Sequence, residues 1–241
     1  MGRAHEVRKQ SMAKTAAMKS AIYGRASKEI YMAAKNGSKD PEANLALRSA
    51  IDKAKSKQVP TDVIQRAIKK AEGNDGESFT SNRYEGYGPG NSMIIVDSLT
   101  NNVNRAIAEI RDAFNKNGGK IANSGAVSHS FQATSLFAFS GLSVEETLEL
   151  LMETDAEVND VVEEDESTVV YASFQSFNTV KTALDNAGVK EYQMAETTML
   201  ADEEMTIAVE EDRIKFEKLI DKLNELEDVQ NVYHNINEET M

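Results

Sequence analysis

Cationic side chains gather in the first third of the chain, where their number suits them to bind phosphate groups. Residues 1–70 contain sixteen Lys and Arg against six Asp and Glu, whereas the rest of the chain contains eleven against thirty-four. The whole 241-residue chain has a formal net charge of −13. Because repulsion between charges more than about 10 Å apart is screened at ~0.1 M salt, a separate basic segment can still dock on a polyanion. The charge distribution therefore predicts a nucleic-acid partner.

Ten of these cations are our candidates for phosphate contacts, and all lie in the basic block. They are Arg3, Arg8, Lys9, Lys14, Lys19, Arg25, Lys28, Lys53, Lys57 and Lys70. For any single lysine the alternative is a solvated helix face with an i,i+4 partner, as Asp62 and Arg66 could form. For the block as a whole we favour phosphate contact, because so many uncompensated like charges repel one another.

Residues typical of catalysis or metal binding do not form a convincing site in this sequence. The three histidines, His5, His129 and His234, are scattered, and cysteine is absent. The glycines of the segment 86–90 lack dinucleotide-loop spacing, and Gly118-Gly119-Lys120 lacks the Ser or Thr that follows the P-loop lysine. We therefore predict a non-enzymatic protein without a cofactor.

Acidic residues 155–166 approximate the ligand spacing of a calcium-binding loop. Asp160, however, stands where such a loop needs glycine, and Val161-Val162 alternate as in a strand. The pattern favours a solvated acidic hairpin over a metal site. Such a hairpin would keep this part of the chain away from nucleic acid or face a basic protein partner.

Apolar periodicity predicts helices in the basic block. A stripe containing Ile22, Ala26 and Ile30 runs from residue 21 to 34, with Arg25, Lys28 and Lys35 off the stripe. A second helix is expected after Asp40 as N-cap, with Leu47, Ile51 and Ala54 buried. A third follows Pro60, with Ile64 and Ala67 inward and Arg66, Lys69 and Lys70 left to solvent. These helices predict a small bundle over residues 1–76.

Residues 77–133 and 201–241 are expected to form one discontinuous α/β domain. The expected elements are a hairpin of strands 82–87 and 93–99, a helix over 102–117, strands over 127–131 and 206–209, another helix, and a last strand over 229–234. The final strand, helix and strand have no complete sheet of their own, so we expect them to return to the earlier strands.

The intervening residues 134–200 are expected to form an inserted acidic domain. Their pattern gives strand, helix, two strands, helix and strand, and Ser143 with Glu146 predicts a capping box at the first helix. This is the βαββαβ order of a ferredoxin-like domain. The sequence thus predicts an α+β protein of three domains.

No stretch approaches the ~20 apolar residues of a membrane span, and the N-terminus lacks the apolar core of a secretory signal. A protein without cysteine is compatible with a reducing compartment. We therefore expect a cytoplasmic protein with no membrane partner, although the basic, acid-poor start also resembles an organelle transit peptide.

Several strings resemble the YebC/PmpR family, and more narrowly its YeeN-like branch. They include the eight-residue run Arg83 to Gly90, the run Asn115 to Gly119 and the terminal run Asp228 to Asn235. The resemblance spans nearly the whole chain, in order. It departs at the start, where this chain lacks the usual Gly-His-Ser-Lys-Trp; without that tryptophan, stacking on a base is in doubt.

The resemblance implies a helical N-terminal domain, two α/β domains around a cavity, and a non-enzymatic role. Members are generally described as cytoplasmic DNA-binding transcriptional regulators, while others resemble ribosome-associated translation factors, including a mitochondrial translational activator. Three hypotheses follow: a DNA-binding transcriptional regulator, a translation factor that binds rRNA on the ribosome, and an adaptor that binds protein only. The sequence has no recognition-helix signature, which favours RNA or shape recognition, whereas the usual family description favours DNA.

Overall fold

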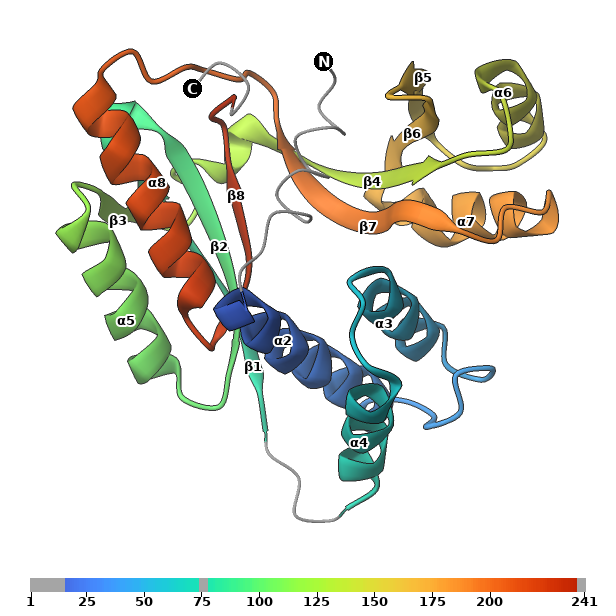
Figure 1. The fold of residues 1–241 in the computed structure, drawn as a ribbon, viewed down its shortest axis with the longest axis horizontal. Helices are drawn as coiled ribbons and strands as arrows, with labels where there is room; N and C mark the ends of the chain where they lie inside the picture. The colour runs from blue at the N-terminus through green and yellow to red at the C-terminus, as the bar shows by residue number, and fades with distance from the viewer. Residues whose placement is uncertain (1–15, 74–77, 238–241) are drawn as a thin grey trace. The chain divides into compact units, whose positions relative to one another are not determined.

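The computed structural model describes residues 16–73 and 78–237 and confirms the predicted α+β class. N-terminal helices accompany two antiparallel four-stranded sheets, one in each of two compact units (Figure 1). One unit comprises residues 131–200. The other combines the described residues before 131 with those after 200, so it contains both the basic helices and the first sheet.

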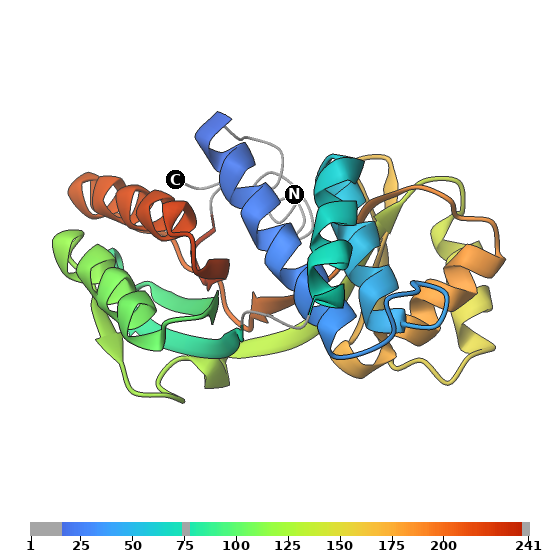
Figure 2. The same cartoon turned by 90° about the horizontal axis from the view of Figure 1, so that it is seen from below.

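Three helices form the basic part of the chain: α2 (Ala16–Lys35), α3 (Leu45–Ser56) and α4 (Thr61–Glu72). Helix α2 packs against both of the others (Figure 2), and Ile30, Tyr31 and Leu47 are at most 2% exposed in their shared core. This confirms the predicted apolar stripes.

The predicted start of the second helix was wrong. Asn44, and not Asp40, is the N-cap of α3: its side-chain oxygen accepts a hydrogen bond from the Leu47 amide at 3.0 Å. The Asn44 amide nitrogen also donates to the carbonyls of Ala33 and Ser38, so this side chain ties the loop to the end of α2. Asp40 instead accepts from the Glu42 amide and forms a local turn.

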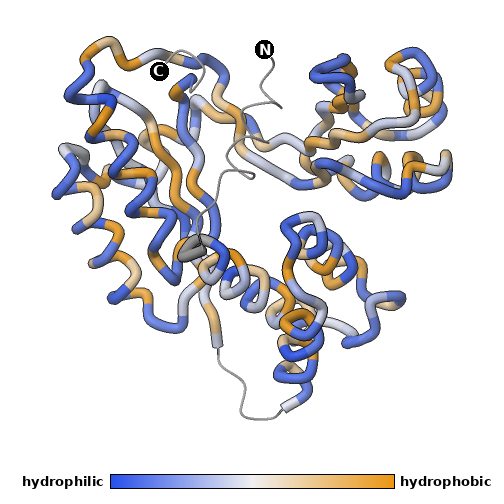
Figure 3. The backbone as a smooth tube through the Cα atoms, viewed as in Figure 1, coloured by the Kyte–Doolittle hydropathy of each residue, from blue (hydrophilic) through white to orange (hydrophobic). Residues whose placement is uncertain are grey.

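The first sheet has the strand order β3-β1-β2-β8, built from β1 (Thr80–Tyr87), β2 (Met93–Thr100), β3 (Lys120–Ala122) and β8 (Val229–His234). Helices α5 (Val103–Lys116) and α8 (Glu210–Glu225) pack together on one face, as Figures 1 and 2 show. Both helices alternate apolar and polar residues (Figure 3), with Ile110, Phe114 and Leu219 fully buried between helices and sheet.

The turn between β1 and β2 confirms the predicted hairpin. The strands pair in antiparallel register from Thr80 opposite Thr100 to Tyr87 opposite Met93. A short 3-10 turn, η1 (Pro89–Asn91), joins them, and Gly90 adopts a φ of 67°, which glycine reaches without the strain that a side chain introduces.

Two strands predicted for this sheet are absent from the structure. Residues 206–209 form no strand; the preceding Met205 forms an isolated bridge with Ile236, and Ile207 fills the core beside Gly90. The segment predicted as a strand over 127–131 contains instead the 3-10 turn η2 (Ser128–Ser130) and the first residue of β4. On the side of β1 away from β2, the paired strand is the short β3. Apolar content misled the prediction, because buried Val127 and Ile207 pack from irregular backbone.

The second sheet confirms the ferredoxin-like prediction. Its elements are β4 (Phe131–Phe139), α6 (Val144–Met152), β5 (Val158–Glu164), β6 (Ser167–Ser173), the 3-10 turn η3 (Phe174–Ser176), α7 (Phe177–Asn186) and β7 (Tyr192–Ala201). The strand order β5-β6-β4-β7 is that of a βαββαβ unit with its first and third strands in the centre. Phe137 and Phe139 of β4 pack under the two helices.

Local signals in this unit also formed as expected. The Ser143 hydroxyl accepts from the Glu146 amide and the Glu146 carboxylate accepts from the Ser143 amide, so the capping box is complete. Acidic residues 158–164 form β5 of a hairpin, whose two turn residues, Asp165 and Glu166, have φ values of 47° and 60°. The domain limits near residues 76, 133 and 200 remain predictions. In the described part of the chain, no helix has the length and apolar character to cross a bilayer.

Candidate nucleic-acid interface

Six of the ten candidate cations lie in the described part of the chain, five on the three basic helices and one directly after α3. Lys19, Arg25 and Lys28 are on α2, Lys53 is on α3, Lys57 directly follows α3, and Lys70 is on α4. Arg3, Arg8, Lys9 and Lys14 lie outside the described residues. Of the six, Lys19 and Lys70 are exposed and the other four are partly buried.

Arg25 binds the last turn of α8, and Lys28 binds the turn directly after that helix. The Arg25 guanidinium donates to the Asn224 carbonyl, and Lys28 Nζ donates to the Glu227 carbonyl at 3.0 Å. Cations are favourable at this end of a helix, where unpaired carbonyls carry partial negative charge. These two candidates therefore hold α2 against α8, a role that the sequence pattern did not reveal.

Lys28 also pairs with Asp228, which is 1% exposed. The same carboxylate accepts two hydrogen bonds from Arg105, at 3.1 and 2.7 Å. Burial raises the pKa of Asp228, but hydrogen bonds from Arg105, Lys28 and Thr100 together outweigh it and lower the pKa. Asp228 is thus an anionic anchor between α2 and the first sheet.

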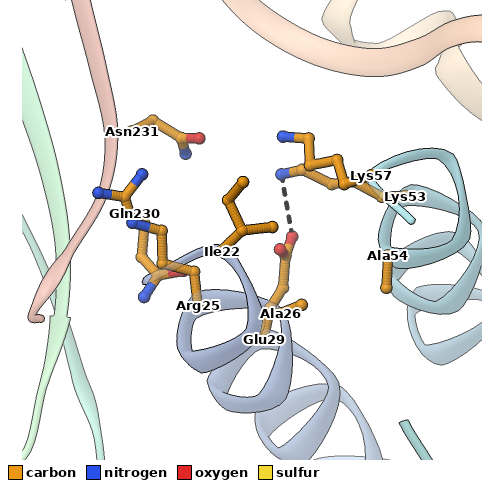
Figure 4. A pocket seen from close by; sticks show the side chains of 9 residues that line it. All are labelled: Ile22, Arg25, Ala26, Glu29, Lys53, Ala54, Lys57, Gln230 and Asn231. Atoms are coloured by element: carbon orange, nitrogen blue, oxygen red, sulfur yellow. Dashed lines mark hydrogen bonds and ion pairs between the residues drawn. The ribbon is translucent and has the colours of Figure 1, made fainter. Parts of the chain in front are cut away.

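Arg25, Lys53 and Lys57 line one pocket between α2, α3 and β8. Glu29, Gln230 and Asn231 complete its polar lining (Figure 4). Both lysine side chains extend from the side of α3 toward α2, and Lys53 Nζ pairs with the Glu29 carboxylate at 3.3 Å (Figure 4). With three cations and one carboxylate among its lining residues, the pocket has an excess of positive charge.

A second group of cations lies on the surface around Tyr31. Lys35 Nζ and Lys70 Nζ lie 6.0 and 5.8 Å from the centre of its ring. Such contacts order the lysine side chains, and Lys35 Nζ also donates to the Gly73 carbonyl at 3.4 Å. We call Lys35 and Lys70 the Tyr31 lysine pair, and both residues are exposed.

Among residues 16–73, several exposed cations were not among the ten candidates. They are Lys35, Lys39, Lys55, Arg66 and Lys69. Lys35, Arg66 and Lys69 fall off the predicted apolar stripes, and that signal alone could have selected them. Arg66 pairs with Asp62 at 2.6 Å, as its i,i+4 spacing predicted, so it is the least available of the set.

The unit over residues 131–200 has the opposite charge, with fourteen Asp and Glu against two Lys. Its β5–β6 hairpin includes Glu163, Glu164, Asp165 and Glu166. In the described residues, no group of three or more His, Asp or Glu side chains is arranged to hold a metal ion. The geometry provides a cationic surface on one unit and an acidic surface on the other.

Comparison of the sequence with models of known protein families assigns the chain to a family. A model of the TACO1/YebC second and third domain matches residues 79–236, and a model of the TACO1/YebC protein N-terminal domain matches residues 3–74. The chain belongs to the TACO1/YebC family. The resemblance to YebC/PmpR proteins in the sequence is thereby confirmed.

Relatives of this family are similar along their full length. A protein of Mesoplasma florum named a "probable transcriptional regulatory protein" is 57% identical over 236 residues, which cover 98% of this chain and 99% of the relative. A protein of the same description from Mycoplasma capricolum subsp. capricolum is 54% identical, with the same coverage. The crystal structure of a conserved hypothetical protein from Aquifex aeolicus is 35% identical, has a TM-score of 0.77 and covers 93% of this chain and 92% of its own. The TACO1/YebC fold thus accounts for nearly all of the chain.

Proposed function

We propose that this protein is a non-enzymatic, nucleic-acid-binding regulator of gene expression that acts in the cytoplasm and binds duplex DNA. The observation that carries the proposal is the exposed cationic surface of α2–α4, including the Tyr31 lysine pair. Lysines held on a rigid helical scaffold suit phosphate contacts, which supply most of the sequence-independent affinity for DNA.

The names of the two relatives support regulation of transcription, because each is described as a probable transcriptional regulatory protein. The charge distribution supports a defined orientation on DNA. A polyanion attracts the basic helices and repels the unit over 131–200, with its fourteen acidic residues, so the helices should face the ligand.

The salt dependence of binding tests this proposal. For duplex DNA, the slope of log K against log salt falls by ~0.9 for each phosphate that the protein no longer neutralises. The double variant Lys35→Glu/Lys70→Glu should therefore flatten the slope by roughly two units and weaken binding at low salt by more than about tenfold. A matched control is Lys218→Glu, which reverses an exposed lysine on α8, outside the basic helices.

If the double variant changed the affinity for DNA and its salt dependence no more than the control does, the proposed interface would be contradicted. Unchanged DNA binding by both variants is one such outcome. Affinity should be measured for duplex DNA, single-stranded RNA and intact ribosomes in parallel, since all three present phosphates.

A second candidate function is translational regulation on the ribosome. The acidic unit over residues 131–200 favours it, because such a surface is suited to basic ribosomal proteins while the basic helices bind rRNA. It predicts ribosome co-sedimentation that survives DNase but not RNase, and tight ribosome binding beside weak, unselective DNA binding. Sequence-selective duplex binding that persists at ~150 mM salt would favour the transcriptional function instead.

A further inference from the structure

The pocket between α2, α3 and β8 contains hydrogen-bond donors without acceptors. Among the described residues, neither Arg25 Nε nor Gln230 Nε2 has a hydrogen-bond partner, and both atoms are shielded from solvent. Both side chains line the pocket (Figure 4). An unsatisfied buried donor destabilises the folded state by roughly 1–3 kcal/mol, so two at one pocket call for an acceptor ligand.

The charge of Arg25 is poorly compensated by its neighbours. Burial lowers the pKa of Arg25 to about 10. The Arg25 guanidinium donates one hydrogen bond to the Asn224 carbonyl. Among the described residues, no carboxylate forms an ion pair with Arg25. A guanidinium that is removed from water and gains only a carbonyl is stabilised by a bound anion.

The size of the pocket limits the anion. Its cavity volume is about 40 Å³. This is room for about three water molecules, at roughly 10–15 Å³ of such volume for each. A space of this size accommodates the oxygen atoms of one phosphate group, whereas a base or a sugar requires more.

We propose that Arg25, Lys57 and Gln230, together with Lys53, form a binding site for one phosphate group. The phosphate oxygens accept hydrogen bonds from the guanidinium and the Gln230 amide, and the two ammonium groups balance the charge. Because the two unpaired nitrogens are shielded from solvent, binding requires a small rotation of the Arg25 and Gln230 side chains.

Glu29 is the competitor of the anion in this site. Its carboxylate pairs with Lys53 at 3.3 Å, and its side chain is 42% exposed, so it can move away from the pocket when a phosphate enters. Removing the negative charge of Glu29 should therefore strengthen phosphate binding. A cluster of residues with a purely structural role would not respond in this direction.

The site goes beyond the proposed function, because it would bind a phosphate even if the protein bound no nucleic acid. The group could belong to a nucleic-acid backbone or to free phosphate. Its residues are different from the Tyr31 lysine pair, so failure of one proposal leaves the other standing.

The experiment is an NMR titration of the full-length protein with inorganic phosphate, in which sodium chloride keeps the ionic strength constant. We expect saturable shifts of the backbone amides of Arg25, Gln230 and Asn231, with a Kd on the order of 1 mM. Lys57→Gln should raise this Kd about fivefold and Glu29→Gln should lower it about threefold, since each alters one charge at the pocket. Arg25 is left intact because it also binds the end of α8.

The matched control is Lys55→Gln, which removes an exposed charge two residues before Lys57, on α3 and outside the pocket lining. Absence of saturable shifts, or an equal effect of Lys55→Gln and Lys57→Gln, would overturn the proposal. A titration with duplex DNA separates the two sources. If Lys57→Gln weakens both ligands, the site takes a backbone phosphate; if it weakens inorganic phosphate alone, the site takes free phosphate.

Discussion

Lys28 Nζ lies 3.0 Å from Asp228 Oδ1, and this ion pair joins the first basic helix to the residue directly before β8. The side chains are 12% and 2% exposed, so the pair is largely removed from water. Two hundred residues separate the partners in sequence. The pair, with Arg105 on the second carboxylate oxygen, connects the basic helices to the sheet of the same unit.

Replacing Asp228 with Asn should destabilise the protein by about 3 kcal/mol. Removing one partner of a buried ion pair leaves the other charge uncompensated, and Lys28 has little access to water here. Urea unfolding followed by circular dichroism measures the change. As a control, Asp62→Asn breaks an exposed pair with Arg66 and should change stability by less than about 1 kcal/mol. Similar destabilisation of the two variants would show that Asp228 is not an anchor.

Stability should fall as the pH is lowered, because two buried carboxylates have lowered pKa values. Burial raises the pKa of Glu85, but hydrogen bonds from the backbone amides of Val127, Gly125 and Ser128 outweigh it and lower the pKa. Asp228 behaves in the same way. A depressed folded pKa stabilises the protein above the unfolded value, about 3.9 for Asp and 4.3 for Glu, and this stabilisation is lost as the pH falls through the folded pKa.

Urea midpoints measured between about pH 7 and pH 3 test this dependence. The decline should begin near pH ~5 and steepen below pH ~4, and it should be shallower in Asp228→Asn, which lacks one of the two groups. A variant profile parallel to that of the wild type would exclude Asp228 as a source of the acid sensitivity.

Replacing Glu85 with Gln should loosen the loop before η2. The carboxylate accepts hydrogen bonds from Gly125, Val127 and Ser128 at 2.7, 2.8 and 2.9 Å. The new glutamine side chain would place an NH2 group, which donates, where a carboxylate oxygen now accepts from backbone N–H groups. We expect this to lower the free energy of unfolding by about 2 kcal/mol. Hydrogen exchange at those three amides should accelerate more than at Ile110 in α5. Exchange equal to that of the control Glu109→Gln, an exposed site on α5, would contradict this role.

Two glycine-to-alanine variants should change stability in opposite directions. A Cβ at Gly86 would lie 2.6 Å from a Phe114 ring carbon and 2.7 Å from the Lys120 carbonyl oxygen, so Gly86→Ala should destabilise by about 2–3 kcal/mol. A Cβ at Gly24, inside α2, would meet no further atom of the described residues within 4 Å. Gly24→Ala should therefore stabilise by about 0.5–1 kcal/mol. Thermal unfolding of both variants measures the two changes in stability. Destabilisation by Gly24→Ala would show that the space around Gly24 cannot accept a methyl group.

Elements encoded by neighbouring residues could be predicted from the sequence. The capping box of Ser143 and Glu146, the hairpin around Gly90 and the end of α5 before Gly118 all formed where expected. Each depends on backbone conformations and hydrogen bonds within a few residues, so the local sequence contains the necessary information. The βαββαβ order followed from the same kind of signal.

The predictions of secondary structure were wrong where contacts between segments far apart in the sequence decided the local conformation. Ile207 has the apolar character of a strand residue but packs against Gly90 from irregular backbone, and the N-cap of α3 is Asn44 because its amide also reaches the end of α2. The spacing of apolar residues along a short segment contains no information about these long-range contacts.

The fold class, the helices of the basic block and the separation of basic from acidic residues could all be inferred from the amino-acid sequence. The tertiary structure alone decided the use of each cation: Lys28 pairs with Asp228, Arg25 and Lys57 line a pocket, and Lys35 and Lys70 lie exposed around Tyr31. The reason is physical. Helix formation depends on residues a few positions apart, whereas burial and ion pairing depend on which remote segment the fold brings next to a side chain.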